Sequence, residues 1–382
     1  MVKTDVAGQV AVRMKQARQE MGFTLRDAAR LLGFGSTYQI LSSIEKGVRQ
    51  VKTAELVQFA KVYNRDLSYF LGAAQPAAQP VVRWRNCAGT PEAKQAEQKF
   101  RQFLSDYAEL EELSGRGVSR FAPGGTHRVS GWREVEELGR TTRQSLELGG
   151  RPALELRTVL EEKYGVKLLI AAMPGAGSAA SAMDGFGAGV LVNATDAPWR
   201  ISFDIAHELF HLLTWEQEFG EEPTAKGSGK LPSEQYADAF AAALLMPEES
   251  IGPEFRSRLK DGELAFLDCI EMARAFGVST EALLWRLVSL RMLSRESVKQ
   301  AMATGELKDV DKSVRKDDWA DHPGAKPSRR FVTIAFECLK KGLVSRGRFA
   351  ELMGIRRGEI AGFLAEYGYD EMGDYVGSIG AS

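Results

Sequence analysis

The sequence has few residues of the kinds that crosslink a protein or anchor it in a membrane. Its three cysteines, Cys87, Cys269 and Cys338, are odd in number and far apart, and none forms a CxxC pair. Neither a disulfide framework nor a cysteine zinc site is therefore indicated. No stretch approaches the ~20 apolar residues of a membrane span, and the N-terminus lacks an apolar run like that of a signal peptide. We therefore expect a cytoplasmic protein that is not bound to a membrane.

The chain also has almost no net charge and no loop of the kind that binds nucleotide phosphates. The formal net charge is −1, yet residues 1–72 hold eleven Lys and Arg against six Asp and Glu, whereas residues 203–263 hold five against thirteen. The N-terminal region therefore suits a polyanion. The Gly-rich stretch from Met173 to Gly187 contains no GxxxxGK[ST] pattern, so we predict a loop there and no nucleotide site.

The length and the apolar pattern indicate several domains that are mostly helical. A chain of 382 residues exceeds the ~250–300 residues that one core usually holds. Most apolar periodicity is helical, with short strands expected at 166–170 and 189–193. We predict a mainly α fold with a small β-sheet (α+β). The expected parts are an N-terminal domain, a linker with an amphipathic helical segment, a central domain and a C-terminal helical domain, at residues 1–72, 73–149, 150–290 and 291–382.

Two of the four histidines stand out by their spacing. His207 and His211 lie four residues apart, and Glu208 directly follows the first. On an α-helix, residues i and i+4 share a face, so both imidazoles can reach one metal ion while the glutamate lies beside it. The neighbouring apolar residues predict a buried helix with Ser202 as its N-cap, where histidines are costly without a partner. This is the HExxH signature of zinc peptidases; the alternative is a pair of core histidines bonded to carbonyls.

A catalytic zinc ion commonly has three protein ligands, so a third is expected elsewhere in the chain. A helical stretch that ends before Pro247 places Glu234 and Asp238 on one face. Glu234 can complete the site while Asp238 accepts the second N–H of a ligand imidazole. Four acidic residues of an expected loop are rivals for the third position, namely Glu216, Glu218, Glu221 and Glu222.

The first 72 residues show a succession of short helices and turns. Thr24 caps the second helix and Gly33 ends it, and further helices give a five-helix bundle. A helix–turn–helix with a basic surplus is typical of proteins that bind the DNA major groove. The runs Thr24–Gly33, Ser43–Gly47 and Leu67–Gly72 resemble the XRE (Cro/repressor-like) helix–turn–helix family. The alternative is a helical docking domain with solvated lysines.

The XRE resemblance implies particular DNA contacts. In that family the third helix reads bases and nearby basic side chains hold phosphates. The base-reading positions would be Ser36, Thr37, Tyr38, Gln39 and Ser42, and the phosphate contacts would come from Arg26, Lys46, Arg49 and Lys52. The span from Gly33 to Glu45 is about two residues longer than the family usually shows, which shifts the start of the reading helix. Because repressor-type domains commonly pair on palindromic operators, we expect a homodimer.

The region around the histidine pair carries a second resemblance. Arg200–His211, followed by Glu234–Pro247, is similar to the ImmA/IrrE family of metallopeptidases, and the likeness spans about residues 150–290. It implies a zincin-like domain with one Zn²⁺ per chain, and Glu208 as the general base. The implied metal ligands are His207, His211 and Glu234. Phe210 stands where the family often has glycine, and we expect it to pack against the neighbouring strand and narrow the cleft.

Together these features predict a DNA-binding transcriptional regulator with a zinc-dependent peptidase domain. Members of the ImmA/IrrE family are implicated in inactivating XRE-type repressors, so the resemblance implies action on a repressor-type protein, or on the chain's own regulation, in a stress or mobile-element response. The expected partners are double-stranded DNA and a protein substrate, such as a repressor or toxin. A strand leading into the HExxH helix would give an extended peptide an edge to bind. The alternative is a non-catalytic repressor or antitoxin that uses the fold to sense a metal or partner.

Overall fold

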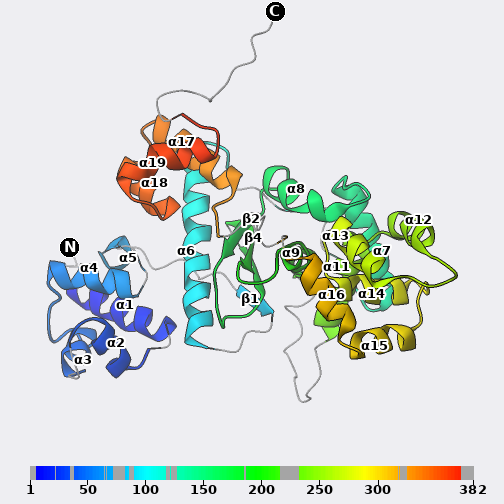
Figure 1. The fold of residues 1–382 in the computed structure, drawn as a ribbon. Helices are drawn as coiled ribbons and strands as arrows, with labels where there is room; N and C mark the ends of the chain where they lie inside the picture. The colour runs from blue at the N-terminus through cyan, green and yellow to red at the C-terminus, as the bar shows by residue number, and fades with distance from the viewer. Residues whose placement is uncertain are drawn as a thin grey trace, which may run out of the picture. The chain divides into compact units, whose positions relative to one another are not determined.

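A computed structural model shows a mainly helical chain with one small sheet (Figure 1). This confirms the α+β class predicted from the sequence. The chain divides into two compact units, of which the first comprises Met1–Val81, Cys87–Phe103 and Met173–Gly177, and the second comprises the rest. The boundaries of the four expected domains stay predictions. The structure describes residues 6–21, 23–34, 38–63, 65, 67–71, 82–85, 90–117, 121, 127–184, 186–215, 232–316, 318 and 325–370.

Residues 6–71 of the first unit form the expected bundle of five short helices. They are α1 (Val6–Glu20), α2 (Leu25–Leu31), α3 (Gln39–Glu45), α4 (Thr53–Val62) and α5 (Leu67–Leu71). Thr24 caps α2 in a capping box with Asp27, which satisfies backbone donors at the helix start. A bidentate ion pair between Arg18 of α1 and Glu45 of α3, with N–O distances of 2.6 Å and 2.9 Å, ties the third helix to the first.

The second unit contains a four-stranded sheet in the order β1-β3-β4-β2. The two middle strands form an antiparallel hairpin, β1 pairs antiparallel with β3, and β2 pairs parallel with β4. Strands β2 and β4 confirm the two strands expected from the apolar pattern. The four strands are β1 (Val82–Arg85), β2 (Lys167–Ala171), β3 (Ala179–Asp184) and β4 (Gly187–Asn193).

Two of these strands differ from the expectations. The predicted loop from Met173 to Gly187 is wrong over its second half, because β3 occupies residues 179–184. Its inner residues are alanines and a serine, which have little strand propensity, but Ala179, Ala180, Ser181 and Ala182 are buried. These small residues therefore form a strand because they are buried in the hairpin, and not because of their own strand propensity. Strand β1 has four residues and was not expected at all.

Helices make up most of the second unit. Helix α6 (Pro91–Leu113) contributes its first residues to the first unit and its last residues to the second. Among the described residues, no helix is long and apolar enough to cross a membrane. The others are α7 (Trp132–Ser145), α8 (Leu156–Glu162), α9 (Pro198–Leu213), α11 (Pro232–Leu245), α12 (Glu248–Arg258), α13 (Phe266–Ala275), α14 (Thr280–Ser289), α15 (Arg295–Ala303), α16 (Glu306–Val314), α17 (Arg329–Lys340), α18 (Arg346–Met353) and α19 (Ile360–Glu366), with short 3-10 turns at Pro152–Leu154 and Arg357–Glu359.

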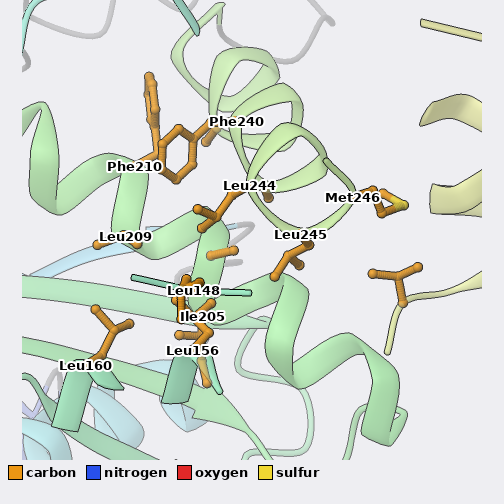
Figure 2. Close-up of a cluster of buried hydrophobic side chains, with 14 of the residues drawn as sticks. Leu148, Leu156, Leu160, Ile205, Leu209, Phe210, Phe240, Leu244, Leu245 and Met246 are labelled. Atoms are coloured by element: carbon orange, nitrogen blue, oxygen red, sulfur yellow. The ribbon is translucent and has the colours of Figure 1, made fainter. Parts of the chain in front are cut away.

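Helix α9 runs through the main hydrophobic core of this unit. Side chains of α9 and α11 meet there with residues from α8 and from the turn before it (Figure 2). Helix α9 begins at Pro198, not after Ser202 as expected, because proline fits the first helical turn, where its missing N–H costs no hydrogen bond. Ser202 instead lies inside the helix, and its hydroxyl donates a hydrogen bond of 3.3 Å to the Ala153 carbonyl.

A second buried cluster consists of charged groups. The Lys167 ammonium of β2 lies 2.7 Å from the Glu111 carboxylate of α6, and neither side chain has any exposed surface. The Arg330 guanidinium of α17 lies 2.8 Å from the other oxygen of Glu111 and donates a 2.8 Å hydrogen bond to the Tyr107 hydroxyl. The Glu111 carboxylate therefore joins the sheet to the C-terminal helices by pairing with two positive charges, one from β2 and one from α17.

Candidate metal centre and nucleic-acid interface

Helices α9 and α11 bring the three expected ligand residues together. The two histidine Nε2 atoms of α9 are 3.2 Å apart. The Glu234 carboxylate at the start of α11 lies 3.4 Å from His207 Nε2 and 3.3 Å from His211 Nε2. One ligand atom from each of the three residues can be chosen so that all lie within 4.8 Å of one another. The helical spacing of the histidines and the packing of α11 on α9 produce this arrangement.

The distances between these atoms suit a small divalent cation. Zinc binds nitrogen and oxygen ligands at about 2.0–2.1 Å in a tetrahedron, whose ligand atoms are then about 3.3–3.4 Å apart. The 3.2 Å between the two histidine nitrogens falls close to that edge length, and the two oxygens of Glu234 lie 3.4 Å from His207 Nε2 and 3.3 Å from His211 Nε2. The lone pairs of two imidazoles and a carboxylate face one another in a buried space, which is unfavourable unless a proton or a cation lies between them. The residues therefore fit a metal ion.

Asp238 fixes the orientation of one ligand histidine. Its carboxylate lies 2.8 Å from His207 Nδ1, one helical turn after Glu234. This contact places the proton of a neutral imidazole on Nδ1 and turns the Nε2 lone pair towards His211 and Glu234. Burial alone would raise the pKa of Glu234, but its contacts with the two histidines outweigh burial, and the pKa falls well below its ordinary value. Glu234 is therefore a carboxylate at neutral pH.

Glu208 lies beside these residues and is not one of the three. It follows His207 on α9 and is buried, so its carboxylate is in a region with few competing water molecules. A buried acid that directly follows a candidate metal ligand in the sequence has the chemistry that a general base needs. The four rival carboxylates of the expected loop, Glu216, Glu218, Glu221 and Glu222, lie outside the described residues.

The phenylalanine at the family's glycine position has a structural contact. Phe210 is buried, and its ring lies 5.6 Å from the ring of Phe240 on α11 (Figure 2). It also meets the His211 imidazole edge-on, at 5.7 Å between ring centroids. The ring of Phe210 thus contacts α11 and a metal-ligand candidate, so this residue helps to hold together the two helices that carry the site. Its expected packing against the neighbouring strand and the narrowing of the cleft stay predictions.

A cavity of about 910 Å³ lies next to the candidate metal centre and was not foreseen from the sequence. Asp238 lines it, whereas His207, His211 and Glu234 do not. Three tryptophans and two arginines from distant parts of the chain contribute to its walls, so no local pattern could reveal it. Its lining includes Trp132 and Glu136 of α7, Trp199, Arg200 and Phe203 of α9, and Trp285 and Arg286 of α14.

In the first unit, the structure places most of the expected DNA contacts on or beside α3. Gln39 and Lys46 are exposed, and Ser42 is partly exposed. Tyr38 precedes α3, and the Arg26 guanidinium lies 5.7 Å from its ring centroid. Ser36 and Thr37 lie outside the described residues.

Two of the expected phosphate contacts lie just after α3 and differ in their surroundings. The Arg49 guanidinium is 2.7 Å from the Glu55 carboxylate of α4, so a phosphate would have to share or replace that partner. Lys52 is exposed and precedes α4. No contact of these residues with DNA has been tested, so their roles stay predictions.

Comparisons with known proteins agree with both resemblances. Residues 14–70 match the helix-turn-helix family, and residues 161–288 match the family described as IrrE N-terminal-like domain, peptidase family M78. Over 60 residues the chain is 37% identical to the HTH-type transcriptional regulator ImmR of Bacillus subtilis (strain 168), which covers 16% of this chain and 46% of that relative. The chain thus spans less than half of the length of this relative. The protein joins an XRE-type helix-turn-helix domain to a peptidase domain of the IrrE N-terminal-like family in one chain.

Proposed function

We propose that this protein is a DNA-binding transcriptional regulator whose second domain is a zinc-dependent peptidase that acts on a repressor-type protein or on the chain's own regulation. The single observation that carries the peptidase part is the cluster of His207, His211 and Glu234, whose ligand atoms all lie within 4.8 Å of one another. The regulator part follows from the helix-turn-helix match and from the similarity to a transcriptional regulator. Both parts are needed to explain why the two domains occur in one chain.

The residues of the site have complementary roles in peptide hydrolysis. A bound zinc ion would lower the pKa of its water and polarise the peptide carbonyl. His207, His211 and Glu234 would hold the ion, and Asp238 keeps the His207 imidazole in the tautomer that ligation needs. The Glu208 carboxylate accepts the proton of the attacking water and returns it to the leaving amine nitrogen. Burial of α9 around these groups excludes other water molecules.

The metal is tested on the purified full-length protein. We expect about one zinc ion per chain by elemental analysis, in line with three protein ligands and one open position. His207→Ala should lose most of this metal, because two ligands are too few to hold it. Glu263→Gln, at an exposed acid far along the same chain, should keep it. A protein free of metal after purification and dialysis against zinc would contradict the proposal.

The peptidase activity is tested with Glu208→Gln. This variant should bind zinc as the parent does, since Glu208 is not one of the clustered ligands, but it should fail to cleave protein substrates. The substrate search starts with the chain itself and with XRE-type repressors. If Glu208→Gln regulates its own promoter region as the parent does, the function is the non-catalytic one, in which the domain senses a metal or partner.

DNA binding is tested by gel shift with the protein's own promoter region at several salt concentrations. Lys46→Ala should lower the slope of log affinity against log salt by about one, because one phosphate contact is lost. Lys15→Ala, at an exposed position on α1, is the matched control and should leave the slope unchanged. Equal slopes for the parent and Lys46→Ala would remove Lys46 from the interface.

A further inference from the structure

Strand β1 is an unusual member of the sheet. Residues 161–288, which match the peptidase family, contain β2, β3 and β4, whereas β1 comes from residues 82–85, far earlier in the chain. It pairs antiparallel with β3, with Val82 opposite Ala182 and Arg85 opposite Ala179. The family-matching strands alone would therefore leave the outer edge of β3 unpaired, and a segment from outside that region covers it.

An open sheet edge is a binding surface for extended peptides. Its unpaired N–H and C=O groups form main-chain hydrogen bonds with an added strand, and side-chain pockets supply specificity. The β3 edge belongs to the hairpin whose second strand, β4, leads into the metal-bearing helix α9. A peptide added to this edge would be held in an extended conformation in the domain that carries the candidate metal centre.

Arg83 connects β1 to the segment that follows the C-terminal end of α9. Its guanidinium lies 5.1 Å from the centroid of the Trp215 ring. Trp215 follows His211 by four residues and lies just after α9, which ends at Leu213 with Thr214 as its C-cap. Strand β1 therefore contacts the chain directly after the helix that carries the metal-ligand candidates, four residues beyond His211.

We propose that Val82–Arg85 occupies, within the same chain, the edge of β3 to which an extended peptide substrate binds. The substrates are then extended segments that pair with β3 and place an arginine on Trp215, as Val82-Arg83-Trp84-Arg85 does. This inference rests on the proposed peptidase function for its catalytic meaning. The segment can be displaced because a pairing of four residues is at the short end of stable strands, so a substrate has to compete with it.

The first test measures binding alone, in full-length protein that carries Glu208→Gln to prevent cleavage. The probe is a fluorescent synthetic peptide with the sequence of residues 79–86, and its affinity is measured by anisotropy. Adding Arg83→Gly and Trp84→Pro removes the Trp215 contact and a backbone donor. This double substitution should tighten peptide binding at least tenfold, which corresponds to about 1.4 kcal/mol of binding free energy. Val82→Thr keeps the strand propensity and should bind like the parent, and a peptide of scrambled sequence should not bind.

The second test keeps the strand in place and does not depend on the folding of a disrupted variant. Trp84 lies opposite Ala180, so Trp84→Cys with Ala180→Cys can lock β1 onto β3 through a disulfide, in a background with Cys87→Ser. The oxidised protein should bind the peptide at least tenfold more weakly than the same protein after reduction.

The outcomes separate the two proposals. Equal affinities of oxidised and reduced protein, or of parent and Gly/Pro variant, including no binding by any of them, overturn the inference. If binding responds as expected but no form of the protein cleaves any peptide, then the peptidase proposal fails while the docking edge stands. If cleavage occurs at the same rate in the oxidised and the reduced protein, the substrate binds elsewhere. In that case the inference about the β3 edge fails while the peptidase proposal stands.

Discussion

A buried acid beside the charged cluster gives a sharp prediction on stability. Glu161 of α8 has a side chain that is 6% exposed, and the Arg157 Nε atom lies 3.8 Å from its carboxylate. Its Oε1 atom is buried without a hydrogen-bond partner among the described residues. Burial raises the pKa of Glu161 from its ordinary 4.5 to about 7, although Arg157 and a hydrogen bond with Ser328 act in the opposite direction. The folded protein therefore holds this proton more tightly than the unfolded chain.

The direction and size of the effect follow from this difference. Because the folded pKa is raised, the stability that the protonated carboxyl provides is fully present below about pH 4.5 and is lost as the pH rises through about 7. A rise of the pKa from 4.5 to about 7 corresponds to roughly 3.5 kcal/mol at about 1.4 kcal/mol per pH unit. Glu161→Gln replaces the carboxyl by a neutral group of the same shape. It should be more stable than the parent by about 3 kcal/mol at pH 8 and nearly equal to it near pH 4.5.

The assay is urea unfolding followed by tryptophan fluorescence at pH 5, 6, 7 and 8. All six tryptophans follow residue 81, so the signal reports the second unit and not the helix-turn-helix bundle. Glu162→Gln, the exposed neighbour on the same helix, is the matched control and should show no such pH-dependent gain. A stability difference between Glu161→Gln and the parent that stays constant from pH 5 to pH 8 would refute the reasoning.

Three further predictions concern contacts within the second unit and within the first unit. Asp238→Asn should weaken zinc binding about 10–100-fold in a chelator competition, because the His207 tautomer is no longer fixed; unchanged affinity would remove its positioning role. Phe210→Ala should destabilise the second unit by about 3–5 kcal/mol in the same urea assay, whereas an effect below about 1 kcal/mol would mean that its contact with α11 is dispensable. Arg18→Ala should destabilise the first unit by about 3–5 kcal/mol in thermal melts followed by circular dichroism, since it leaves the Glu45 carboxylate buried without its partner; a melting temperature equal to that of the parent would contradict this.

Patterns within single helices could be predicted from the sequence. The spacing of His207 and His211 places them on one face of α9, and the same rule brings Glu234 and Asp238 to one face of α11. Thr24 predicted the start of α2, because an N-cap residue forms its hydrogen bond within the first turn of the helix. In each case a few neighbouring residues contain all of the required information. The roles of these residues at the metal remain predictions.

Features that depend on contacts across the chain could not be predicted in this way. Strand β3 is built of small residues whose burial comes from the surrounding hairpin, and β1 is too short for its alternation to be recognised. The Glu111 carboxylate meets Lys167 and Arg330 from distant segments, and nothing in its local sequence marks it as buried. The cavity beside the candidate metal centre is likewise lined by residues from α7, α9, α11 and α14.

Asp238 belongs to two environments at once. It accepts the His207 hydrogen bond on one side and lines the cavity of about 910 Å³ on the other. A molecule that enters the cavity and bonds to this carboxylate draws on the same acceptor that orients the metal-side imidazole. By thermodynamic reciprocity, a metal ion bound by the histidines would change the affinity of the cavity for that molecule by the same factor by which the molecule would change the affinity for the metal. The two sites are thus joined by one shared side chain, with no change of fold needed to couple them.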